Sequence, residues 1–276
     1  MARRAVVGAA AGLLLAAAAA AQGVMIAPHA VVIDHRTRSG SVTLYNPNAE
    51  PAEVTISVIY GYPVTDSAGN ISLYAPEHPD STEPSASGWI QAFPRRLTVM
   101  PLERQIVRLL ARPPASLPDG EYWARLVVAT KGGAVPVSGV PDTSQIHVGL
   151  NLEVRSVLGV YYRKGAVKTG LRVSRLRATV EGDSLVARVR LERSGNAAFL
   201  GTVHGTLTDS TGARRAQFDM PLGVFTVFEP RFATAVGMLP RGRYTLRFVA
   251  EAVRSDLPGL ALPLPAVRDS VEVRVP

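Results

Sequence analysis

The chain contains no cysteine among its 276 residues. This absence excludes a disulfide framework and any zinc site built on cysteine. Apolar residues at i, i+3, i+4 and i+7 are not sustained anywhere after the first 21 residues, which argues against helices. Phosphate-binding glycine loops, dinucleotide fingerprints and the G-x-S-x-G nucleophile motif are also missing. The sequence therefore predicts an all-β protein without the motifs of the common enzyme classes.

A long apolar run occurs only near the start of the chain, where Arg3 and Arg4 precede Ala5–Ala21. A run of about 17 residues is at the short limit for spanning a membrane. Small residues at its end, Ala19-Ala20-Ala21, suit a signal peptidase. We therefore expect residues 1–21 to be a cleavable signal peptide and the mature chain to be periplasmic, with no stable membrane span. An uncleaved signal anchor is the alternative.

Charge and polar clusters give little sign of a chemical site. The formal net charge is +8, but the arginines are scattered along strand-like segments, which argues against nucleic acid as a partner. The five histidines show no metal-ligand spacing, and no set of convergent polar groups can be assembled. We expect no cofactor, no metal and no catalytic residue, so the protein is predicted not to be an enzyme. A hydrolase with an unrecognised site is the weakest alternative.

Short alternating segments separated by turn residues run through the whole chain. Ser41–Tyr45 and Ala52–Tyr60 flank an Asn-Pro-Asn turn, and we expect them to pair as a hairpin. Gly61–Gly88 is rich in proline and serine, so it is predicted to be an excursion with at most one short strand, Ile71–Tyr74. About seven strands before residue 165 favour an immunoglobulin-like sandwich.

The same pattern of strands and turns repeats after a polar, glycine-containing segment at Arg163–Gly170, which is predicted to link two domains. We expect a signal peptide at 1–21, an immunoglobulin-like domain at 22–164 and a second β-sandwich domain at 165–276.

The clearest period of two lies in Thr143–Tyr162. Alternate side chains of a strand point to opposite faces, so this segment has one apolar and one polar face. The apolar row consists of Ile146, Val148, Leu150, Leu152 and Val154. Such a row usually covers the core of its own domain. The other interpretation is an edge strand whose row is lent to a partner chain.

The order of several motifs in residues 24–165 resembles the periplasmic pilus chaperones, the PapD-like family. The segments that carry the resemblance are Ile26-Ala27-Pro28 with Val31–Ile33, Ser41–Asn48, Phe93–Val99 with Pro101, Gln105–Leu109, Leu117–Tyr122 and Val157–Arg163. This resemblance implies two immunoglobulin-like domains in a boomerang. It also implies that the last strand of the first domain is lent to a pilin subunit that lacks a strand.

Carried onto this chain, the lent row would be Ile146 to Val154, and the partners would be secreted or pilus-type subunits, with an outer-membrane usher as a further partner. The family anchors the carboxyl terminus of the subunit with two basic residues, but the matching positions here are Ala30 and Gly159. Basic residues close by are the candidate anchors: Arg155, Arg163 and Lys164. The rival function is a structural or adhesive surface protein in which the row faces its own core.

Overall fold

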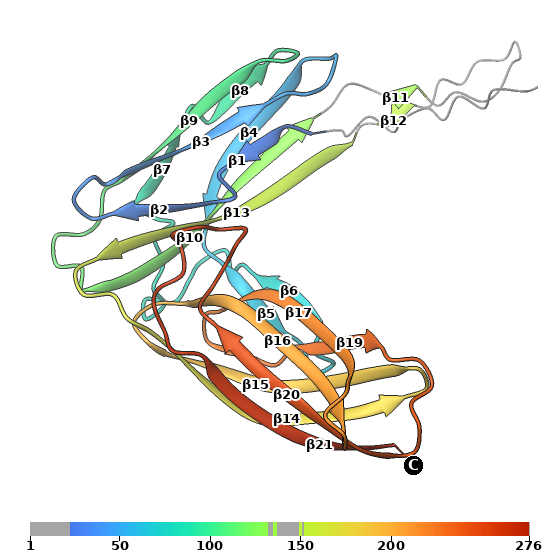
Figure 1. Cartoon of the computed structure of the whole chain (residues 1–276). Helices are drawn as coiled ribbons and strands as arrows, with labels where there is room; N and C mark the ends of the chain where they lie inside the picture. Colours follow the sequence, from blue (N-terminus) through green and yellow to red (C-terminus); the bar gives the residue numbers. More distant parts are fainter. Residues whose placement is uncertain (1–22, 132–134, 137–148, 151, 276) are drawn as a thin grey trace, which may run out of the picture.

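The computed structural model describes residues 23–131, 135–136, 149–150 and 152–275. All regular structure in these ranges is β, arranged as two lobes (Figure 1). The described ranges contain no helix long and apolar enough to cross a membrane. The predicted signal peptide at 1–21 lies outside them. The fold class is therefore all-β, as the sequence predicts.

The first lobe is a sandwich of a four-stranded and a five-stranded sheet. The four-stranded sheet has the order β1 (Met25–Ala27), β3 (Ser39–Tyr45), β9 (Arg104–Ala111), β7 (Ile90–Phe93). The five-stranded sheet has the order β2 (Ala30–Asp34), β13 (Glu153–Lys164), β10 (Gly120–Lys131), β4 (Ala52–Ile59), β8 (Arg96–Val99). Two further strands, β11 (Val135–Pro136) and β12 (Gly149–Leu150), pair with each other.

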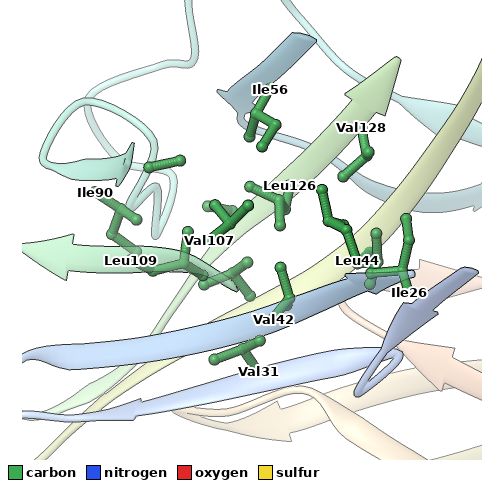
Figure 2. Close-up of a cluster of buried hydrophobic side chains, with 14 of the residues drawn as sticks. Ile26, Val31, Val42, Leu44, Ile56, Ile90, Val107, Leu109, Leu126 and Val128 are labelled. Atoms are coloured by element: carbon green, nitrogen blue, oxygen red, sulfur yellow. The ribbon is translucent and has the colours of Figure 1, made fainter. Parts of the chain in front are cut away.

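Alternation within these strands builds the first core (Figure 2). In β9, Val107 and Leu109 are fully buried, whereas Ile106 and Leu110 lie on the outer face. In β10, Leu126 and Val128 are fully buried and meet the β9 pair across the sandwich interior. Burial of a Val or Leu side chain contributes about 1.5–3 kcal/mol, so the period of two specifies which face turns inward.

The second lobe is another sandwich, joined to the first through residues 165–168. One sheet contains β14 (Thr169–Glu181), β15 (Ser184–Gly195), β18 (Val227–Phe228) and β19 (Arg231–Ala235), with both short strands paired to β15. The other has the order β17 (Arg214–Val224), β16 (Phe199–Asp209), β20 (Gly242–Glu251), β21 (Val267–Val275). Its core is separate from the first and contains the fully buried Phe199, Leu246 and Phe248.

The expected hairpin between Ser41–Tyr45 and Ala52–Tyr60 is wrong. β3 pairs with β1 and β9, whereas β4 pairs with β10 and β8 in the opposite sheet. The buried Asn46 side chain donates hydrogen bonds to Glu50 O (2.8 Å) and Val99 O (2.9 Å). These bonds hold the connection as a crossing between the two sheets instead of a tight turn within one sheet.

The segment Gly61–Gly88 contains two strands instead of at most one. β5 (Tyr62–Thr65) pairs with β6 (Ile71–Tyr74) as an antiparallel hairpin. The turn between them is closed by Asp66, whose carboxylate accepts hydrogen bonds from the backbone and side chain of Asn70. This hairpin lies beside the second lobe (Figure 1).

Candidate partner-binding site

Strand β13 has different neighbours along its two halves. From Gly159 to Arg163 it lies between β10, which is antiparallel to it, and β2, which is parallel to it. From Glu153 to Leu158 it pairs only with β10 among the described residues. The parallel ladder begins at the pair Ala30–Gly159, because β1 and β2 belong to different sheets and the chain crosses between them at Pro28–His29.

The unpaired edge of β13 presents backbone groups in a fixed order. Backbone N–H and C=O groups of successive strand residues point to opposite edges. Arg163 O accepts a hydrogen bond of 2.9 Å from His35 N on the β2 side. By alternation, the groups of Glu153, Arg155 and Val157 point to that same side, where β2 is absent. An unpaired strand edge of this kind is a template for an added strand.

The apolar row of β13 is partly core and partly exposed. Leu158, Val160 and Tyr162 are buried in the first core, whereas Leu152 and Val154 on the same face are 44% and 37% exposed. Gly23 lies against Val154 at the start of the described chain. The backbone of Leu150 belongs to β12, and Ile146 and Val148 lie outside the described residues.

The other face of β13 turns toward the second lobe. On this face Ala30 and Gly159, the two positions singled out by the sequence resemblance, are direct cross-strand neighbours. Arg125 of β10 is the next residue in the row. A methyl group on Gly159 would lie 2.6 Å from Tyr161 Cε2 and 3.0 Å from Arg125 Nη1. Gly159 therefore leaves the space over which the Arg125 guanidinium extends.

Arg125 is a buried cation that has no acidic partner within the described ranges. It is 7% exposed, and Nε donates a hydrogen bond of 2.8 Å to Gly61 O. Its guanidinium lies 4.9 Å from the centroid of the Phe225 ring, and Nη2 has no hydrogen-bond partner among the residues that the structure describes. Burial of an uncompensated charge is costly, so the site favours an anion that compensates it.

Sequence reasoning missed Arg125. The signal was available as an arginine between the apolar residues Ala124 and Leu126, but its cross-strand position opposite Gly159 depends on the pairing register. That register is not visible in one sequence.

The three basic residues suggested by the sequence have partners of their own. Arg155 pairs with Glu153 at 2.5 Å and its side chain is 71% exposed on the cleft-side face of β13. Arg163 forms an ion pair with Glu121, and Lys164 donates a hydrogen bond to Leu117 O. Their competing contacts make them weaker candidates for a carboxylate anchor than Arg125.

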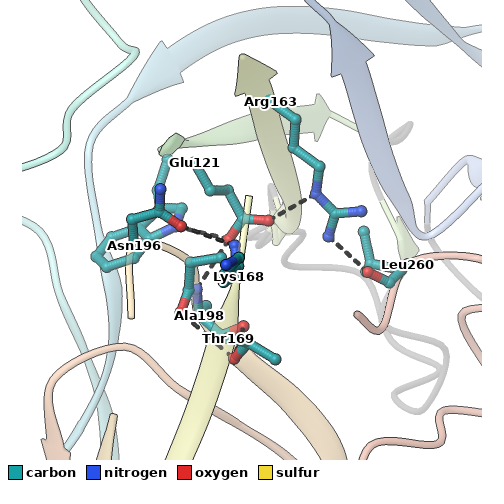
Figure 3. Close-up of polar contacts among 9 residues, drawn as sticks. Glu121, Arg163, Lys168, Thr169, Asn196, Ala198 and Leu260 are labelled. Atoms are coloured by element: carbon teal, nitrogen blue, oxygen red, sulfur yellow. Dashed lines mark hydrogen bonds and ion pairs between the residues drawn. The ribbon is translucent and has the colours of Figure 1, made fainter. Parts of the chain in front are cut away.

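Glu121 joins the two lobes through buried polar contacts (Figure 3). Its side chain is fully buried and accepts hydrogen bonds from Arg163 Nε (2.8 Å), Trp123 Nε1 (2.9 Å) and Ala198 N (3.1 Å). Arg163 Nη2 also donates to Leu260 O at 2.6 Å. Because Ala198 and Leu260 belong to the second lobe, this network fixes the lobes relative to each other.

An aromatic cluster lies beside this network. The Phe225 ring of the second lobe stacks with Tyr62 and Tyr161 at centroid distances of 5.8 and 6.2 Å and meets Trp123 edge-on at 4.8 Å. Tyr60 belongs to the same cluster, and its buried hydroxyl has no hydrogen-bond partner in the described structure. Burial, followed by the charge of Glu83, raises the pKa of Tyr60 well above its ordinary value.

Replacing Tyr60 with Phe should stabilise the protein. The substitution removes an unsatisfied buried hydroxyl, so we expect the free energy of unfolding to rise by about 1 kcal/mol near neutral pH. A raised folded-state pKa gives stability that is present below the unfolded pKa of about 10 and is lost as pH rises above it. The advantage of Tyr60→Phe should therefore grow above about pH 10. Urea unfolding at neutral and alkaline pH measures the free energy of unfolding of the variant and of wild type. Tyr74→Phe, at an exposed tyrosine, is the control. A Tyr60→Phe variant less stable than wild type would contradict the prediction.

Two adjacent pockets lie between the lobes. One, of about 450 Å³, lies between the β1–β2 connection and the loop containing Asp256 and Leu257. The second, of about 390 Å³, shares His29, Ala30 and Leu257 with the first and extends to Arg125. No cluster of three or more potential metal ligands occurs in the residues with described positions.

Similar known proteins occur among solved structures. No family model matches the chain, and no curated protein matches it. Solved structures that are similar include the YadV chaperone, with 16% identity, a TM-score of 0.47 and coverage of 90% of this chain and 98% of that one. A complex of the CsuC chaperone with the CsuE tip adhesion subunit from Acinetobacter baumannii has 14% identity, a TM-score of 0.46 and coverage of 91% and 97%. The CupB2 chaperone of Pseudomonas aeruginosa has 14% identity, a TM-score of 0.43 and coverage of 91% and 100%.

Proposed function

We propose that this protein is an exported, periplasmic chaperone that lends the edge of β13 to secreted or pilus-type subunits. The observation that carries the proposal is the change of neighbours at Gly159. Before this residue β13 has one edge that no described strand pairs with, and Leu152 and Val154 are exposed beside it. A subunit with an incomplete sandwich has the complementary need for a strand and apolar cover. An outer-membrane usher stays a prediction of the sequence resemblance.

Two interactions contribute to the free energy of binding in such a complex. An added strand pairs with the backbone groups of Glu153, Arg155 and Val157. These main-chain hydrogen bonds give affinity that does not depend on the side chains of the partner. Burial of Leu152 and Val154 by the subunit contributes up to about 1.5–3 kcal/mol for each side chain, less the part already buried. The apolar row that continues through Ile146, Val148 and Leu150 extends the same face in the sequence.

Arg125 favours one direction for the partner strand. A strand added to the unpaired edge must end or leave the sheet at Ala30, because β2 occupies the edge from there on. If it runs parallel to β13, its carboxyl end arrives beside the Arg125 guanidinium. If it runs antiparallel, its amino end arrives there and like charges meet. We therefore assign the role of carboxylate anchor to Arg125, in place of the basic residues that the family carries at the positions of Ala30 and Gly159.

Val154→Glu should strongly weaken capture of the partner while leaving the fold intact. The exported protein is purified from the periplasm with its bound proteins, and one captured subunit is then co-expressed with each variant. Wild type should keep that subunit soluble as a one-to-one complex, whereas Val154→Glu should lose at least about 30-fold in affinity because a buried charge replaces an apolar contact. Circular dichroism checks that the variant is folded.

The matched control is Ile106→Glu, which places the same charge on an exposed side chain of the other sheet, 59% exposed. This variant should hold the subunit as wild type does. Equal loss in both variants would indicate a general effect of charge, and full capture by Val154→Glu would show that the edge is not the binding site.

A further inference from the structure

The β5–β6 hairpin forms one wall of the pocket that contains Arg125. Pro63 and Leu73 of the hairpin line this pocket together with Val157 of β13 and Phe225 and Leu257 of the second lobe. Leu73 is 43% exposed and Val157 is 46% exposed, so apolar surface from two separate segments faces the same space. Its volume of about 390 Å³ is within the range of small-ligand sites.

The hairpin is held in place by the second lobe. Glu229 N donates a hydrogen bond of 2.8 Å to Thr65 Oγ1, and Arg231 N donates one of 3.2 Å to Gly69 O. Gly69 has φ +85°, and a methyl group there would lie 2.8 Å from the Arg231 backbone nitrogen. This close approach needs glycine, both for the backbone conformation and for the space. The wall is therefore fixed before any partner arrives.

We propose that this pocket receives an apolar side chain at the carboxyl terminus of the partner strand, and that Leu73 is a specificity-determining residue. The proposal rests on the proposed function and adds to it the chemical class of the partner's carboxyl-terminal residue, which is apolar. It applies to a partner strand that runs parallel to β13 and ends beside Arg125.

The strand geometry selects the residue concerned. Facing residues in a sheet point their side chains to the same face. A partner residue opposite Val157 therefore points to the cleft-side face, where Leu73 and Pro63 lie. The next position, opposite Leu158, points to the core face, and Ala30 of β2 occupies the position after it. The residue opposite Val157 is therefore the last on the free edge whose side chain points to the cleft-side face. Its carboxylate then lies toward Arg125, and its side chain lies in the apolar part of the pocket.

Two labelled peptides test the inference with the whole protein. Both are nine-residue peptides of alternating Val and Thr with a free carboxyl end, one with Leu and one with Ser as the final residue. Fluorescence anisotropy should show that wild type binds the Leu peptide about tenfold more tightly than the Ser peptide, because only Leu gains from apolar burial. Leu73→Ser should lower this preference at least threefold.

Two control variants separate the inference from the proposed function. Ile71→Ser changes an exposed residue of the same hairpin strand that does not line the pocket, and it should keep the wild-type preference. Val154→Glu should weaken both peptides by the same factor and leave their ratio unchanged.

The outcomes are distinguishable. Equal binding of the two peptides by wild type, or an unchanged preference in folded Leu73→Ser, would overturn the inference and leave the lent edge standing. Failure of wild type to bind either peptide would overturn both proposals.

Discussion

Glu121→Ala is expected to destabilise the protein by about 3–5 kcal/mol. The substitution leaves three donors without their acceptor: the Arg163 guanidinium, Trp123 Nε1 and the Ala198 amide. The Arg163 side chain is only 14% exposed, so water cannot replace the lost carboxylate fully. Removal of one partner from a buried ion pair costs more than the pair contributes, because the remaining charge is left uncompensated.

Urea unfolding followed by circular dichroism measures the loss of unfolding free energy in Glu121→Ala. Two further variants serve as comparisons. Glu121→Gln keeps an acceptor for Trp123 and Ala198 but removes the charge opposite Arg163, so its loss should be smaller than that of Glu121→Ala. Glu272→Ala removes an exposed carboxylate that pairs with Arg274 at 2.7 Å and should cost less than about 1 kcal/mol. A loss in Glu121→Ala no larger than in Glu272→Ala would show that the buried network does not hold the lobes together.

Phe225→Ala should cost about 3–5 kcal/mol and should uncouple the lobes. The ring is 2% exposed and contacts three aromatic residues of the first lobe, so its removal leaves a cavity at their junction. It also removes the aromatic face that lies 4.9 Å from the Arg125 guanidinium. We expect calorimetry to show two separated transitions in the variant, because each sandwich retains its own core while the contact between them is lost.

Phe218→Ala is the matched control for this prediction. Phe218 stacks on Phe232 within the second lobe at a centroid distance of 4.9 Å and makes no part of the junction cluster. Its loss should lower the stability of the second sandwich without changing the arrangement of the lobes, which small-angle X-ray scattering measures. If the scattering of Phe225→Ala equals that of Phe218→Ala, the aromatic cluster does not fix the cleft.

Alternation predicted most strands of this chain but not their partners. The alternation in Arg104–Leu110 predicted a strand, because alternate side chains point to opposite faces, and the structure shows that Val107 and Leu109 are on the buried face. Pairing was predicted from adjacency for β3 and β4, and this failed because a sandwich sends consecutive strands to opposite sheets. The fixing contact is the buried Asn46 amide, whose hydrogen bond to Val99 O spans 53 residues of sequence.

At the candidate site, too, alternation predicts the strand but not its neighbours. The row that contains Leu152 and Val154 also contains Leu158 and Val160, so one pattern covers exposed and buried positions. The change between them depends on where β2 joins the sheet, which is a long-range pairing. Strand β5 was missed for a local reason: Pro63 lies inside it, and proline argues against a strand unless that strand lies at an edge.

The row Ala30–Gly159–Arg125 has a consequence for how relatives of this chain should be compared. The three residues lie side by side on the adjacent strands β2, β13 and β10. A basic side chain on any of these strands can place a positive charge at this position of the sheet. Gly159 and Arg125 share one volume, so a larger residue at 159 requires a smaller one at 125. We therefore expect the two positions to vary together among relatives, and a search of single alignment columns would report a charge as lost where it has moved to the neighbouring strand.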